Sequence, residues 1–194
     1  MHETTDRLIC SIKEHTYILR GDRNMKRELA FDFSVEKENN SIRIKKEFDG
    51  PNQLVWDGWT TADLLDQWWG PQPWHVETKT LDFTINGIWH YAMVGPEGEK
   101  HWNLSQFIAI EEGQSFMYKD GFCDEHGIIN QDMPQGTWLL SFSEAENTTL
   151  VDCKISMGTS EELQTILDMG FQEGISMCLK QLDALLERTL NTQE

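Results

Sequence analysis

Apolar and polar residues alternate along much of the chain, beginning at Leu29. The same period of two returns at 42–48 and continues through most of 74–157. This period is typical of strands that bury one face. Turn-forming residues separate the apolar runs, as at Asn86-Gly87 and in the Gly-Pro-Glu-Gly run at 95–98. The pattern predicts two strands near the start and then an antiparallel meander, with strands at 74–83, 88–94, 101–110, 115–119, 137–143 and 149–157.

Helical patterns flank this meander. Gly50-Pro51 predicts the start of a short helix, and a Thr-x-x-Asp sequence at 60–63 predicts a second one that carries Trp68 and Trp69 and ends at Gly70-Pro71. The chain closes with apolar residues at helical spacing, which begin after a capping-box sequence at 159–162. This last helix of about 30 residues is long enough to cross a whole domain.

Two glycines, Gly170 and Gly174, lie one turn apart on the last helix. Glycine is unfavourable in a helix interior by about 1 kcal/mol relative to alanine. The two glycines form a notch without side chains on the helix surface. This notch either lets another element approach, leaves room for a ligand, or marks a break into two helices.

Residues 1–24 lack a strong period, apart from one short apolar patch at 17–19. We predict that they form a poorly ordered upstream extension, with a docked strand or helix as the alternative. Residues 25–194 then form a single domain. Two strands, two short helices, a meander and a terminal helix predict an α+β fold.

The net charge of −17 restricts the partners. Residues 1–27 carry six basic and four acidic side chains, a net +2, so the remainder carries −19. An acidic body repels phosphate backbones and anionic membrane surfaces, which argues against nucleic acid and membrane as partners. The start lacks the apolar core of a secretory signal, and the four cysteines are widely spaced, so we expect reduced thiols in a cytoplasmic protein.

Seven of the eight tryptophans fall between Trp56 and Trp102. This concentration predicts either a heavy aromatic core or an aromatic-lined cavity.

Four motifs resemble one family. They read EFDGPNQLVWDGWT at 47–60, LDQWWGP at 65–71, NGIWHYAMVGPEG at 86–98, and GFQEG at 170–174, the last followed by leucines at helical spacing. Together they resemble the START-like/SRPBCC (Bet v 1-like) superfamily, in the branch named after the C-terminal domain of the heat-shock protein 90 ATPase activator. The resemblance covers about 25–188. Asn86 departs from it, since the family often has glycine there.

The resemblance implies a helix-grip fold, in which a curved antiparallel sheet wraps around the long C-terminal helix, with two short helices after the first strand. It also implies a cavity between sheet and helix that holds apolar molecules in many relatives. The alternative is that the same aromatic residues simply fill the core. On the cavity hypothesis the ligand-binding residues are Trp69, Trp74, Trp89, Tyr91, Met93, His101, Phe122, Gly170, Glu173, Gly174 and Met177.

Other chemistry has weaker support. His90 has the opposite parity to Tyr91 and is expected to face solvent. The Cys-Asp-Glu-His run at 123–126 lacks a second ligand pair, so we predict no metal, and no motif indicates a cofactor or a catalytic triad. Glu173 and Asp120, the latter expected at a strand end, are the candidates for an acid or base.

Three hypotheses of function follow. The first is a protein that binds a small hydrophobic or amphipathic molecule. The second, from the family name, is a co-chaperone that activates the heat-shock protein 90 ATPase. The third is a cyclase or hydrolase that works inside the cavity. A small hydrophobic molecule is therefore the expected partner, a chaperone is the alternative, and a homodimer stays open.

Overall fold

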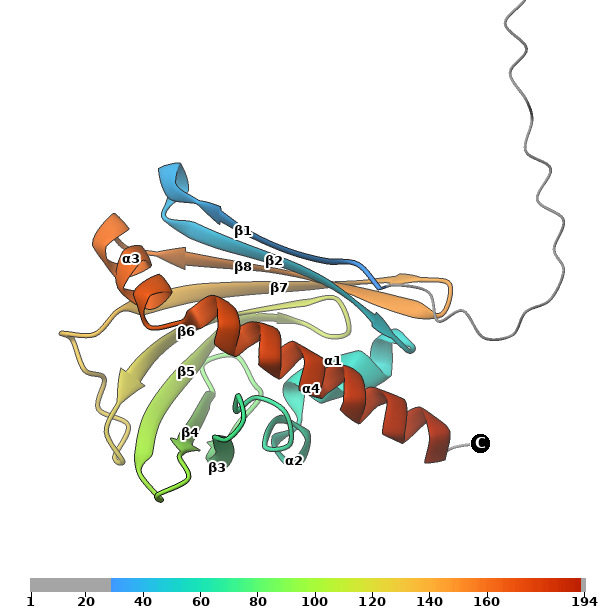
Figure 1. The fold of residues 1–194 in the computed structure, drawn as a ribbon, viewed down its shortest axis with the longest axis horizontal. Coiled ribbons are helices and arrows are strands. Elements are labelled where there is room, and N and C mark those ends of the chain that lie inside the picture. Colours follow the sequence, from blue (N-terminus) through green and yellow to red (C-terminus); the bar gives the residue numbers. More distant parts are fainter. Residues whose placement is uncertain (1–28, 193–194) are drawn as a thin grey trace, which may run out of the picture.

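The computed structural model describes residues 29–192, and the extension predicted for 1–24 lies outside them. All eight strands form one antiparallel sheet in the order β1-β2-β8-β7-β6-β5-β4-β3. The sheet curves around α4, which crosses its concave face (Figure 1). The strands are β1 (Phe31–Glu36), β2 (Ser41–Asp49), β3 (His75–Leu81), β4 (Ile88–Val94), β5 (Lys100–Glu111), β6 (Ser115–Cys123), β7 (Gln135–Ala145) and β8 (Thr148–Met157).

Four α-helices and one 3₁₀ turn accompany the sheet. They are η1 (Lys37–Asn39), α1 (Asn52–Thr60), α2 (Ala62–Leu65), α3 (Ser160–Asp168) and α4 (Phe171–Thr192). In Figure 1, α3 lies beside the N-terminal end of α4, and α1 lies beside its C-terminal half. This arrangement confirms the predicted helix-grip α+β fold. None of the helices within residues 29–192 has the combination of length and apolar character that crossing a membrane requires.

Two predicted boundaries were wrong. The strand predicted at 115–119 continues to Cys123 as β6, so Asp120 lies inside a strand rather than at its end. α2 ends at Leu65, and Trp68 and Trp69 lie in the turn that follows it. The expected capping box at Thr60 does not form, because the Thr60 hydroxyl donates to the carbonyl of Trp56 at 2.9 Å and Thr61 takes the cap position.

The terminal helix is broken at Gly170. This residue has φ +83°, in the left-handed region that favours glycine, and it separates α3 from α4. The capping box before α3 forms as predicted: Thr159 Oγ1 accepts from the N–H of Glu162 at 3.1 Å, and Glu162 Oε2 accepts from the N–H of Thr159 at 2.9 Å. Of the three roles proposed for the notch, a break is therefore realised at Gly170.

Tryptophan side chains fill one half of the space between the curved sheet and the helices. Trp56 of α1 packs against Phe83, Phe116 and Phe142 with ring centroids 5.0–5.9 Å apart. Beyond it, Trp68 is fully buried and donates from its indole N–H to the carbonyl of Gly58 at 2.8 Å. This half of the interior is a solid aromatic core.

The apolar face of α4 holds the helix in the sheet. Its buried residues follow helical spacing, and Leu182 at their centre is fully buried. Met177 lies on the other side of the helix and exposes 41% of its surface. We expect Leu182→Ala to reduce the free energy of unfolding by about 2–5 kcal/mol, because it removes buried methyl groups and leaves a cavity.

Urea denaturation followed by circular dichroism would measure this loss. Met177→Ala is the matched control, since a comparable truncation at an exposed site is expected to change stability by about 0.5 kcal/mol or less. Equal losses in the two variants would contradict the assignment of the docking face.

Candidate functional site

The other half of the space between the sheet and α4 is hollow. A cavity of about 420 Å³ lies between the concave face of the sheet and the N-terminal part of α4. Strands β4 to β8 form its floor, α3 and α4 form one wall, and the segment that connects α2 to β3 forms its roof. The aromatic residues therefore serve both predicted purposes, since some fill the core and others line a cavity.

Strand register explains the floor. Tyr91, Asn103 and Phe122 are cross-strand neighbours on β4, β5 and β6, so their side chains share the concave face. A second row runs from Ser105 through Asp120 and Gly136 to Met157. Gly136 has no side chain, and Met157, Ile155 and Trp138 pack around the position that a Cβ would occupy, at 3.3–3.5 Å. The inner boundary of the hollow is set by Trp138 and Trp69, whose rings are 5.8 Å apart.

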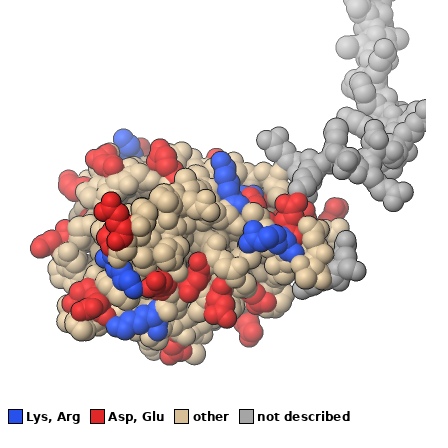
Figure 2. Space-filling model, turned by 60° about the horizontal axis from the view of Figure 1, so that its bottom comes forward, with Lys and Arg blue, Asp and Glu red and all other residues tan. Residues whose placement is uncertain are grey.

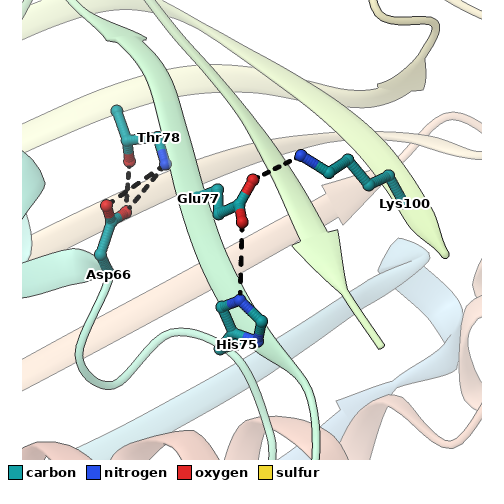
Figure 3. A network of polar contacts seen from close by, with 5 residues as sticks. All are labelled: Asp66, His75, Glu77, Thr78 and Lys100. Atoms are coloured by element: carbon teal, nitrogen blue, oxygen red, sulfur yellow. Dashed lines mark hydrogen bonds and ion pairs between the residues drawn. The ribbon is translucent and has the colours of Figure 1, made fainter. Parts of the chain in front are cut away.

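The roof segment is fastened at both ends. Figure 3 shows Asp66 accepting from the backbone N–H and the hydroxyl of Thr78, at 3.1 and 2.6 Å, which ties the end of α2 to β3. At the other side, Gln181 of α4 donates to the carbonyls of Trp68 and Gly70, both at 2.7 Å. These bonds hold Trp69, Pro71 and Trp74 over the cavity.

Beside the roof, Glu77 lies between Lys100 and His75, and the dashed lines in Figure 3 mark both contacts. The hydrogen bond from Lys100 is the main reason that the pKa of Glu77 is lowered. All three groups are solvent-exposed, so this network, which connects β3 to β5 across β4, contributes little stability.

Most of the predicted binding residues line the cavity. These are Trp69, Trp74, Tyr91, Met93, His101, Phe122, Gly170 and Gly174.

Three predicted residues lie outside it. Trp89 is buried behind Tyr91, with the two rings stacked 3.9 Å apart, and its indole donates to Thr78 Oγ1 at 3.0 Å. Glu173 and Met177 project outward from α4. The helix starts after the break at Gly170, so its inward positions are Phe171, Gly174, Ile175 and Cys178 rather than a continuation of the earlier register.

His90 was expected in solvent but exposes only 5% of its surface. It lies on the convex face, as its parity predicts, and the loop after β6 covers it. Its ring lies 4.9 Å from that of Trp102, and Nε2 is 3.2 Å from the carbonyl oxygen of Asp124. The alternation placed His90 on the correct face, but no local pattern showed that a loop covers that face.

The cavity wall also holds residues outside the predicted binding set, among them Asn103, Asp120, Trp138, Ile155 and Phe171. Extending the alternation of β4 across to its neighbours would have found the strand residues among them. His101 lies at the rim, with its ring 5.2 Å from that of Trp74.

One polar group stands out in this apolar lining. Asp120 is half-buried and accepts from the hydroxyl of Ser105 at 2.7 Å through Oδ1. Burial raises the pKa of Asp120 from 3.8 to about 6, and the Ser105 hydrogen bond only partly opposes that effect. At neutral pH the cavity therefore holds a mostly ionised carboxylate.

Tyr91 supplies the second polar group. Its hydroxyl accepts from the indole N–H of Trp69 at 3.0 Å. Burial raises the pKa of Tyr91 well above its ordinary value, and the nearby Asp120 adds to this shift. The phenol therefore keeps its proton, which stays available for donation.

Among the described residues, neither the thiols nor the Cys-Asp-Glu-His run at 123–126 offers a reactive centre. The Cys178 thiol donates to the carbonyl of Trp69 at 2.9 Å, and burial raises its pKa to about 12. Burial also raises the pKa of Cys123 to about 11. Within residues 29–192, no three histidine, cysteine, aspartate or glutamate side chains are grouped to hold a metal.

The curved sheet, the helix that it wraps around and the hollow between them define a helix-grip protein. The sequence profile of Activator of Hsp90 ATPase homolog 1-like protein matches residues 49–187. This match spans most of the chain, so the chain belongs to that family, a branch of the START-like/SRPBCC superfamily.

Solved structures agree. Protein Ms6760 from Mycobacterium smegmatis is 31% identical over 82% of this chain and 97% of its own, with a TM-score of 0.75. A protein from Arthrobacter aurescens is 31% identical over 81% of this chain and 91% of its own, with a TM-score of 0.77. A protein from Staphylococcus epidermidis is 27% identical over 80% and 94%, with a TM-score of 0.71. Among curated proteins, none matches the chain.

The pKa of Asp120 generates a stability prediction. The folded protein binds this proton more tightly than the unfolded chain does, so ionisation lowers stability as the pH rises from about 4 to about 6. Asp120→Asn removes the buried charge and keeps an acceptor for Ser105. We expect this variant to be more stable than the wild type by about 1–3 kcal/mol at pH 7.5, and equally stable at pH 3.5. Urea denaturation at both pH values is the measurement, and a variant less stable at pH 7.5 would contradict the prediction.

Proposed function

We propose that this protein binds a small apolar or amphipathic molecule in the cavity between its sheet and α4. The single observation that carries this proposal is a hollow of about 420 Å³ lined mainly by aromatic and aliphatic side chains. Its volume lies within the roughly 300–1,000 Å³ typical of small-molecule sites, and an apolar cavity of about 150 Å³ already binds benzene.

A packing defect is a poor explanation for this volume, because protein interiors are close-packed with few voids larger than a water molecule. The hollow is partly open to solvent, so water can enter it. An apolar occupant that displaces this water gains free energy by burying its own surface against the lining.

The lining also suits an amphipathic occupant. Trp69, Trp138 and Phe122 offer flat apolar surface, while Asp120 and Tyr91 offer polar groups at one place on the floor. Apolar walls with a few directed polar groups are the usual composition of a specific small-molecule site.

The two alternative hypotheses rest on less. The co-chaperone role has support from the family description, and it stays a prediction. A cyclase or hydrolase would need Asp120, since Glu173 faces away from the cavity. The thiols of Cys123, Cys153 and Cys178 are free, which supports a cytoplasmic location for the binding protein.

Gly174 offers a direct test of the proposal. A Cβ built at this position would lie 3.9 Å from Pro71 Cγ, an ordinary contact, so a larger side chain can enter the cavity without backbone strain. We expect Gly174→Leu to fold and to lose affinity for the neutral dye prodan by at least tenfold. Prodan emission, which shifts to the blue in an apolar site, provides the titration.

Glu173→Leu is the matched control, because it places the same side chain on the outer face of the same helix. This variant is expected to bind prodan like the wild type. If the wild type fails to bind prodan, or if Gly174→Leu binds it with unchanged affinity, ligand binding in this cavity is overturned.

A further inference from the structure

We propose that the cavity selects molecules that carry a protonated amine, with Asp120 as the group that recognises it; this inference rests on the proposed function. The argument starts from the unused bonding capacity of the floor. Asp120 Oδ1 accepts from Ser105, whereas Oδ2 has no hydrogen-bond partner among the described residues. A carboxylate in an apolar cavity is costly until it is paired.

The protein provides no counter-charge of its own. Among residues 29–192, no lysine, arginine or histidine forms an ion pair with Asp120. A ligand cation in the cavity would complete the pair and form a charge-assisted hydrogen bond to Oδ2.

Neighbouring acceptors fit an ammonium group. Asn103 lies diagonally across from Asp120 on the adjacent strand, is buried, and lines the cavity. Its Nδ2 already donates to the carbonyl of His101 at 3.3 Å, and its Oδ1 has no partner among the described residues. An ammonium has three N–H donors, so it can reach Asp120 and this amide oxygen together.

The remaining lining and the surface favour the same charge. Trp69, Tyr91 and Trp138 are among the lining residues, and aromatic rings attract cations to their faces. Acidic side chains predominate on the face shown in Figure 2, and the whole chain carries −17. This field raises the local concentration of cations and disfavours anionic ligands.

Three naphthalene compounds of similar size test the inference. Naphthylmethylamine is cationic at pH 7.5, naphthylmethanol is neutral, and naphthoate is anionic. Competition with prodan on the wild-type protein at physiological salt measures their affinities. We expect the amine to bind at least tenfold more tightly than the alcohol, and naphthoate to bind most weakly.

Asp120→Asn then isolates the recognising group. It is expected to bind the amine at least tenfold more weakly than the wild type does, while its affinity for the alcohol changes by less than about threefold. Glu112→Gln removes the same charge from an exposed turn and is expected to leave all three affinities unchanged. Gly174→Leu is expected to abolish amine binding, which separates the cavity from attraction to the acidic surface.

The outcomes distinguish the two proposals. If prodan binds but the amine has no advantage over the alcohol, or keeps its affinity in Asp120→Asn, the amine inference is overturned and the cavity proposal stands. If Glu112→Gln reduces the affinity for the amine as much as Asp120→Asn does, attraction to the acidic surface explains the binding and the inference is again overturned. If prodan does not bind the wild type, both proposals fail.

Discussion

Trp69 is the residue on which the interior depends. Its ring contacts those of Trp59, Trp68, Trp89 and Trp138 at centroid distances of 5.2–5.8 Å, and its indole N–H donates to the hydroxyl of Tyr91. Its backbone carbonyl accepts from the Cys178 thiol, so the residue connects roof, floor and helix at once. The ring of Trp69 separates the aromatic core from the cavity. The cavity therefore stays open without disturbing the packing of the core.

The fold explains why that space lies beneath the first turns of α4. From Ile175 onward, buried leucines of α4 meet the sheet and α1. Toward its N-terminus the helix offers Gly174, and the strand below offers Gly136. At Gly174 the helix has open space, since a Cβ there would meet only Pro71 Cγ, at 3.9 Å, whereas Met157, Ile155 and Trp138 pack around Gly136. The break at Gly170 directs α3 along the edge of the cavity.

The sequence predicted the architecture well because periodicity reports burial directly. The alternation of the strands, the capping box at Thr159 and the family motifs together predicted the helix-grip fold, and most of the predicted binding residues line the cavity. Asn86 fits as well, since its φ of +69° lies where asparagine substitutes for glycine at modest cost.

The misses share a different physical origin. Met177 was placed in the wall because the helix was treated as continuous, and the left-handed residue at Gly170 resets the register. His90 was placed in solvent because no local signal shows that a distant loop returns over the convex face. Asp120 was placed at a strand end because its strand could not be followed past Lys119. Each error concerns tertiary context, which outweighs local pattern.

The cavity and Asp120 are departures from what stability alone would select. A filled cavity and a neutral side chain at position 120 would both give a more stable domain, because voids and unpaired buried carboxylates each carry a cost. Departures of this kind are expected at functional sites, where stability is given up for recognition. The two departures also lie at one place, with the carboxylate on the floor of the hollow. Their coincidence argues that the hollow and the charge serve the same ligand, since independent packing faults would have no reason to meet there.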